Sequence, residues 1–191
     1  MRKVVLSANV TLDGFMSGPN GELDWHFCNW NEELGVYAYE QLHTMDTILV
    51  GRRTYETMAS HWPHASRHNG AKQQDIAFAD RMNQLPKIVF STTLKKVYWN
   101  NSRLVKDHIS EEVQRLKRQP GMDMIMWGGV GIVSSFVKLN LIDEYRIFVS
   151  PVVIGRGKPL FREALQQQQL RLLEVRPFSN GVVLCRYLKG F

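Results

Sequence analysis

Three short stretches of the sequence combine glycine or hydroxyl residues with groups that bind anions, and each follows an apolar run. They are Gly51-Arg52-Arg53-Thr54, Ser91-Thr92 and Gly128-Gly129-Val130-Gly131. Arginine presents a guanidinium fork that matches phosphate oxygens, and hydroxyls donate to the same oxygens. A glycine turn before a helix exposes backbone N–H groups beside the positive end of the helix dipole. The three stretches together predict one extended, phosphate-bearing ligand.

Each stretch also has an interpretation that needs no ligand. The glycine run could serve only a tight connection from strand to helix, because glycine lacks a Cβ and turns easily. Its G-G-x-G spacing differs from the Rossmann G-x-G-x-x-G pattern. One of the two arginines could be an ordinary surface residue. Repetition favours the ligand, since all three turns follow strands and open α/β sheets bind ligands at the carboxyl ends of their strands.

Asp13 follows the first strand-like run and begins a loop rich in glycine and proline. At that place a carboxylate could orient a substrate or relay a proton. An Asx turn, in which Asp13 bonds its own backbone, is the competing interpretation. Asp24 and Trp25 lie in the aromatic-rich segment that follows and could line the substrate side, although core packing also explains aromatic residues.

The apolar periodicity predicts a wound α/β sheet that ends in antiparallel strands. Helices are expected after the N-cap Asn31, after the N-cap Ser110, and from the glycine run to about Leu139. Asn180-Gly181 predicts a hairpin turn. Residues 61–80 are expected to form a solvated insertion with one short helix at 77–83. The expected strands are 4–9, 47–50, 86–94, 99–105, 124–127, 143–151, 170–175 and 181–188.

Composition narrows the functional classes. The chain of 191 residues fits a single domain spanning 1–191, with a net charge of +6 and a pI of about 9.4. Its basic residues form no run of five, so a nucleic-acid partner would rest on the pI alone. Cys28 and Cys185 stand apart without zinc-ligand spacing, which predicts free thiols and no metal site. The sequence lacks a signal-peptide pattern and a membrane-length apolar run, so we expect a cytoplasmic protein.

An ordered set of motifs across nearly the whole chain resembles the dihydrofolate reductase-like superfamily. Within it, the sequence is most similar to the reductase domain of the bifunctional riboflavin-biosynthesis deaminase–reductase and to its stand-alone relatives. The motifs are Thr11-Leu12-Asp13-Gly14-Phe15, Glu22-Leu23-Asp24-Trp25, residues 46–56 with Gly51-Arg52-Arg53-Thr54, Lys87-Ile88-Val89-Phe90-Ser91, Gly128-Gly129, and Pro151 through Gly155-Arg156-Gly157-Lys158-Pro159-Leu160-Phe161.

The resemblance implies a three-layer α/β/α fold and NADPH binding. By this resemblance, residues 51–54 would hold phosphates at a helix start, Ser91 and Thr92 would meet the adenosine end with its 2′-phosphate, and residues 128–131 would cradle the pyrophosphate. The Ala8 backbone would face the nicotinamide carboxamide. The loop from Asp13 through Gly14 to Met16 would close over the nicotinamide, with Asp13 near the reacting centre. The riboflavin branch also implies a homodimer.

The resemblance transfers the cofactor half of the site more fully than the substrate half. A dihydrofolate reductase has a Pro-Trp pair after its mobile loop and an acid on the next helix; the pair is missing here, and only Glu32 or Glu33 could supply the acid. We therefore expect an NADPH-dependent reductase of a small heterocycle, of the type 5-amino-6-(5-phosphoribosylamino)uracil reductase. The alternatives are a dihydrofolate or pterin reductase and a nucleotide-binding protein without turnover. Neither nucleic acid nor a membrane is an expected partner.

Overall fold

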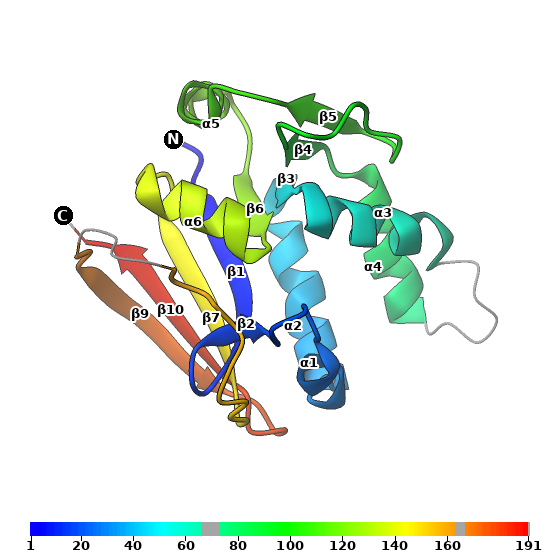
Figure 1. Ribbon diagram of the computed structural model, residues 1–191. Helices are drawn as coiled ribbons and strands as arrows, with labels where there is room; N and C mark the ends of the chain where they lie inside the picture. The colour runs from blue at the N-terminus through cyan, green and yellow to red at the C-terminus, as the bar shows by residue number, and fades with distance from the viewer. Residues whose placement is uncertain (66–72, 163–166, 191) are drawn as a thin grey trace.

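The computed structural model describes residues 1–65, 73–162 and 167–190. Within these residues the chain forms three layers, in which one large sheet lies between two layers of helices (Figure 1). The strands are β1 (Val4–Thr11), β2 (Phe15–Ser17), β3 (Met45–Gly51), β4 (Lys87–Phe90), β5 (Ser102–Val105), β6 (Asp123–Trp127), β7 (Glu144–Ser150), β8 (Lys158–Pro159), β9 (Leu170–Pro177) and β10 (Val183–Lys189). The helices are α1 (Asp24–Cys28), α2 (Glu32–His43), α3 (Arg52–Ala65), α4 (Gln73–Gln84), α5 (Ile109–Arg118) and α6 (Val130–Lys138).

The large sheet has the strand order β5-β4-β3-β6-β1-β7-β10-β9. Every neighbouring pair from β5 to β7 is parallel. Strand β10 runs antiparallel to both β7 and β9. The predicted α/β class, a mainly parallel sheet with antiparallel strands at the end of the chain, is therefore confirmed. Strands β2 and β8 pair separately in a small sheet that the periodicity did not predict.

Both faces of the parallel region are buried, which explains why its strands are apolar throughout. On one face, Val4 and Leu6 of β1 pack with residues of α5 and α6 such as Phe136. On the other face, Val5 packs with residues of α2, α3 and α4 such as Tyr55. Figure 1 shows the two helical layers on opposite sides of the sheet.

Two local signals in the sequence are confirmed by hydrogen bonds and dihedral angles. Asn31 caps α2, since its Oδ1 accepts the Leu34 N–H at 3.0 Å. Gly181 has a φ of +84° in the turn between β9 and β10, where a side chain would be strained. The first-turn acids of α2 add favourable charge at its N-terminus.

Two other predictions are wrong. Residues 61–65 continue α3 and residues 73–84 form α4, so the solvated insertion is not observed outside residues 66–72, which lie beyond the described part of the chain. The Trp62 and Phe78 rings lie 5.0 Å apart and join these helices, an apolar contact hidden within a polar composition. Helix α5 begins at Ile109 after His108, which has a φ of +50°, so Ser110 lies inside the helix.

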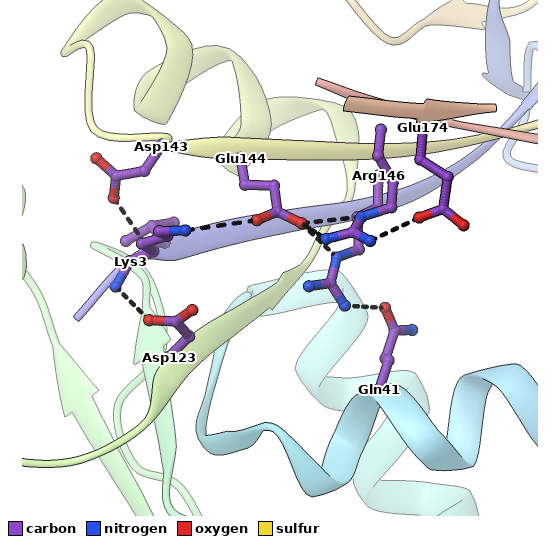
Figure 2. A network of polar contacts seen from close by, with 9 residues as sticks. Lys3, Gln41, Asp123, Asp143, Glu144, Arg146 and Glu174 are labelled. Carbon is purple, nitrogen blue, oxygen red and sulfur yellow. Dashed lines mark hydrogen bonds and ion pairs between the residues drawn. The ribbon is translucent and has the colours of Figure 1, made fainter. Parts of the chain in front are cut away.

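A buried carboxylate ties the antiparallel strands to the rest of the sheet (Figure 2). Glu144 is 3% exposed. Its Oε1 accepts from Arg146 Nε at 2.8 Å and from Arg186 Nη2 at 3.0 Å. Arg146 also donates to Gln41 of α2 at 3.3 Å. Burial alone would raise the pKa of Glu144, but the bonds and charges of both arginines outweigh it and hold the pKa below its ordinary value of 4.5.

Replacing Glu144 by glutamine should destabilise the protein by about 3–5 kcal/mol in urea unfolding, because two arginines would lose their shared buried partner. The control Glu174→Gln removes a half-exposed partner of Arg186 and should cost about 1 kcal/mol or less. The lowered pKa means that the Glu144 contribution is present above pH 4.5 and is lost as the pH falls through the folded-state pKa. Equal losses in the two variants would contradict this assignment.

Candidate functional site

The three anion-binding turns predicted from the sequence meet at the carboxyl edge of the sheet. Arg52 Nη1, at the end of β3, donates to Thr93 Oγ1, after β4, at 3.0 Å. A Cβ placed on Gly129, after β6, would lie 3.6 Å from Thr54 Oγ1. Parallel pairing of these strands brings their ends together, and the contacts show that the turns touch one another.

The glycines of these turns fall into two groups. A Cβ on Gly51 would lie 3.0 Å from the Ile132 side chain, and a Cβ on Gly128 would lie 2.6 Å from Val133. These two glycines are explained by close packing against α6. A Cβ on Gly131 would meet nothing within 4 Å, and one on Gly129 would meet only Thr54 in ordinary contact. Packing therefore does not require glycine at 129 or 131, whereas close approach of a ligand to the backbone would.

The start of α6 offers backbone donors to such a ligand. Gly129 is the N-cap residue, and among the described residues no side chain caps the helix. The Val130 side chain is buried, so only its backbone could contribute to a site. The first N–H groups of a helix have no partners within the helix, and the dipole adds positive charge beside them. This geometry suits the pyrophosphate of a dinucleotide.

The polar side chains of the other two turns differ in how many hydrogen bonds they make within the protein. Arg52 is half exposed and also bonds Glu56 at 3.0 Å, an exposed pair that costs little to exchange for a phosphate. Arg53 and Thr92 are exposed. Ser91 Oγ accepts the N–H groups of Thr93 and Leu94 at 3.2 and 3.0 Å, so it shapes its own turn.

Strand β1 has a free backbone edge beside these turns. It pairs with β7 as far as Thr11, but with β6 only as far as Ser7, which lies opposite Trp127. From Ala8 onward, the β6 side of β1 has no ladder partner among the described strands. Ala8 is only 3% exposed as a whole residue, and contact of its backbone with a ligand stays a prediction. An amide such as a nicotinamide carboxamide can bond a backbone edge of this kind.

Asp13 forms hydrogen bonds with the nearby Thr11 and with a loop far along the chain. Neither the catalytic interpretation nor the Asx turn anticipated these partners. The Thr11 hydroxyl donates to Asp13 Oδ1 at 2.6 Å, and the N–H groups of Ile154 and Gly155 donate to Oδ2 at 3.2 and 2.8 Å. The bond from Thr11 has the largest effect and lowers the pKa of Asp13. Burial opposes it, and the backbone bonds of Gly155 and Ile154 lower the pKa further, so that it lies below its ordinary value. Asp13 is thus ionised at neutral pH and joins two loops, while its orienting role toward a substrate stays a prediction.

The loop that contains Gly14 and Met16 is held by the small sheet. Gly14 has a φ of +84°, and its carbonyl accepts the Leu160 N–H at 3.0 Å. Strands β2 and β8 pair beside it. A Cβ on Gly157 would lie 2.3 Å from the Ser17 carbonyl oxygen, so glycine is required there. Together with Asp13, these contacts fix the loop against residues 152–160 at the end of β1.

The substrate side is less fully defined. Asp24 is exposed at the start of α1. Trp25 is 8% exposed, and its Nε1 has no hydrogen-bond partner within the described residues. Glu33 accepts the Ser179 N–H and hydroxyl, both at 2.9 Å, so it holds the β9–β10 hairpin. That engagement leaves Glu33 poorly placed to act as the acid of a pterin site.

Several site residues were missed from the sequence. Thr93 bonds Arg52, and it could have been found as the third hydroxyl of the run after β4. Ile154 and Gly155 act through backbone N–H groups, which no side-chain pattern reveals. Among the residues that the structure describes, no cluster of three or more histidine, cysteine or acidic residues could hold a metal ion. No helix within that part of the chain is long and apolar enough to cross a membrane.

Comparison with known proteins identifies the family. The model of the RibD C-terminal domain matches residues 2–184. The chain belongs to the RibD C-terminal domain family. The uncharacterized protein YyaP of Bacillus subtilis is 36% identical to it over 186 residues, which cover 97% of this chain and 94% of YyaP. Membership in the RibD C-terminal domain family supports a reductase-type function.

Solved structures share the fold at low sequence identity. RibD of Acinetobacter baumannii superposes with a TM-score of 0.70 at 16% identity, covering 100% of this chain and 58% of that protein. Dihydrofolate reductase of Enterococcus faecalis, in a complex that contains NADP(H), superposes with a TM-score of 0.64 at 12% identity, covering 99% and 97% of the two chains. The dihydrofolate reductase-like fold expected of this RibD C-terminal domain is confirmed.

Replacing Asp13 by asparagine should loosen the contact between the two loops. Asparagine has one acceptor oxygen in place of two and no negative charge, so the bonds to Thr11, Ile154 and Gly155 cannot all be kept at their present strength. We expect the amide hydrogens of these two residues to exchange at least about tenfold faster, as measured by hydrogen exchange. Asp107→Asn, at an exposed position, is the matched control. Unchanged exchange in Asp13→Asn would show that Asp13 does not hold the loops together.

Proposed function

We propose that this RibD C-terminal domain is an NADPH-dependent reductase of a small heterocycle, of the 5-amino-6-(5-phosphoribosylamino)uracil type. The observation that carries the proposal is the meeting of three turns at the free edge of β1, with glycines at 129 and 131 that packing does not explain. A solved structure from Thermotoga maritima, named as a diaminohydroxyphosphoribosylaminopyrimidine deaminase and 5-amino-6-(5-phosphoribosylamino)uracil reductase, has the same fold at 18% identity and a TM-score of 0.67.

The residues at this edge fit an extended cofactor, because the space beside Gly129 and Gly131 is open to a ligand. The N–H groups at the start of α6 would hold the pyrophosphate, and Arg52 and Arg53 would neutralise phosphate charge. Thr92 and the turn of Ser91 would meet the 2′-phosphate end, and the Ala8 backbone would hold the carboxamide. When bound, NADPH supplies the hydride. Asp13 keeps the loop with Gly14 and Met16 closed over that place, which excludes water.

The substrate would lie beyond the nicotinamide, toward α1. Trp25 offers a buried N–H without a partner in the described part of the chain, and Asp24 offers a carboxylate. A heterocycle with carbonyl and amino groups could meet both, and proximity to the cofactor would supply most of the catalysis. The engagement of Glu33 with Ser179 leaves only the exposed Glu32 as the acid that the alternative of a dihydrofolate reductase requires. A protein that binds the nucleotide without turnover is the remaining alternative.

The double variant Arg52→Ala/Arg53→Ala should bind NADPH at least about tenfold more weakly, because it loses charge-assisted bonds to phosphate. Fluorescence titration measures the affinity. The control Arg118→Ala/Arg171→Ala removes two exposed arginines elsewhere and should leave the affinity unchanged. The unmodified protein should also bind NADPH more tightly than NADH. An unchanged affinity in the first variant would remove those arginines from the site.

Turnover is measured separately, as oxidation of NADPH on adding the pyrimidine ribosylamine phosphate or dihydrofolate. Oxidation with the pyrimidine only supports the proposal, and oxidation with dihydrofolate only favours the alternative. Tight binding of NADPH without its oxidation in the presence of either compound would contradict the reductase proposal and favour a protein that binds the nucleotide without turnover.

We also propose that the protein is a homodimer that uses the edge strand β9. This strand exposes Leu172, Leu173 and Val175, which are 51%, 40% and 54% exposed. A long edge strand with exposed apolar residues favours association with a second chain.

The double variant Leu172→Glu/Val175→Glu should therefore be a monomer in light scattering coupled to size exclusion, while the unmodified protein has the mass of a dimer. The control Val36→Glu changes an exposed apolar residue of α2 and should stay dimeric. A monomeric unmodified protein would refute this part of the proposal.

A further inference from the structure

A pocket of about 600 Å³ opens at the amino edge of the sheet, opposite the edge where the three turns meet. It lies between the end of α4, the starts of β3 and β4, and helix α5. Four arginines line it, Arg2, Arg81, Arg103 and Arg115, together with one carboxylate, Asp46. We call it the arginine pocket. None of these residues belongs to the proposed cofactor site.

The carboxylates near the arginine pocket do not neutralise it. Asp46 pairs with Arg2. Two arginines share the Glu112 carboxylate. Arg103 pairs with it, and Arg115 donates two hydrogen bonds to it, at 2.7 and 3.0 Å. Four guanidinium groups thus face two carboxylates. Arg103 and Arg115 are each about half exposed, so either could leave Glu112 for a ligand at small cost.

Arg81 carries the uncompensated charge. Its Nη2 donates to the Met45 carbonyl at 2.8 Å. Its Nε is buried and has no hydrogen-bond partner among the described residues, and no described carboxylate pairs with it. A buried donor without an acceptor is costly, more so when it belongs to a charged group.

Stabilisation of the C-terminus of α4 does not account for this arginine. The last carbonyls of that helix, residues 82–84, already accept from Lys87 Nζ at 2.9 and 3.0 Å and from Asn101 Nδ2 at 3.2 and 3.0 Å. Arg81 bonds β3 rather than its own helix. Arg81 lines the pocket, so its guanidinium group, which has no carboxylate partner among the described residues, lies beside a molecule bound there.

We propose that the arginine pocket is a second anion site, which binds a small phosphate-bearing molecule independently of the cofactor edge. Arg81 is the principal ligand, and Arg103 and Arg115 turn toward the phosphate from their shared carboxylate. Planar guanidinium groups bond phosphate oxygens in pairs, which makes phosphate a better match than a single carboxylate.

The test uses the full chain labelled with ¹⁵N-arginine and inorganic pyrophosphate as the probe, at constant ionic strength. The Arg81 Nε–H signal, assigned by its loss in Arg81→Lys, should shift and saturate with an apparent Kd at or below about 1 mM. Calorimetry should show binding at least about tenfold weaker in Arg81→Ala, and unchanged in the control Arg171→Ala. The Arg81 shift should persist in Arg52→Ala/Arg53→Ala, which separates this pocket from the cofactor edge.

Three results would overturn the proposal. Shifts confined to Arg52 and Arg53 would mean that pyrophosphate binds only at the cofactor edge. Equal, non-saturating shifts of all arginines would mean general ion pairing. Citrate binding as tightly as pyrophosphate would remove the preference for phosphate. If Arg81→Ala does not fold, the Arg81 signal of the unmodified protein, assigned with Arg81→Lys or by through-bond correlation, still decides the question.

Discussion

Parallel pairing of β1 with both of its neighbours is the constraint on which the candidate site depends. Because β3, β4, β6 and β1 run in the same direction, the residues that follow them arrive at one edge. Reversing β6 alone would carry Gly128 and Gly129 to the opposite edge, away from Arg52. The early end of the β1–β6 ladder at Ser7 then leaves the next backbone groups of β1 without a strand partner on the β6 side among the described residues. The sheet thus provides both the cluster of turns and the open edge next to it.

The glycines at this edge have two kinds of surroundings, which the sequence does not distinguish. Gly51 and Gly128 let α6 approach the sheet, and a methyl group there would collide with Ile132 or Val133. Gly129 has room for a methyl group, and its φ is compatible with other residues. Packing against α6 therefore explains Gly128 within the glycine run, while the ligand interpretation of Gly129 and Gly131 stays a prediction.

Much of the fold could be predicted because local chemistry and tertiary structure agree. Apolar runs became the central strands, and the side chain of Asn31 caps its helix as expected. The prediction of a solvated insertion at residues 61–80 failed, because its polar composition concealed the apolar contact of Trp62 with Phe78 between two helices. The bonds of Asp13 to Ile154 and Gly155 were also not anticipated, because these partners are backbone groups far along the chain. The family resemblance predicts a cofactor at the edge where the three turns meet. No motif pointed to the pocket around Arg81, because residues from separate elements form it.

The way Asp13 holds its loop affects how the protein can diverge. Its carboxylate bonds the main chain at 154 and 155, so the contact does not depend on the side chain at Ile154. Side chains at 152–154 and at 156 can therefore change while the loop keeps its position. Two glycines are exceptions: Gly155 has a φ of +71°, and a side chain on Gly157 would strike the backbone of Ser17. Related chains can in this way alter the surface beside the proposed nicotinamide site while Asp13 keeps the same support beneath it.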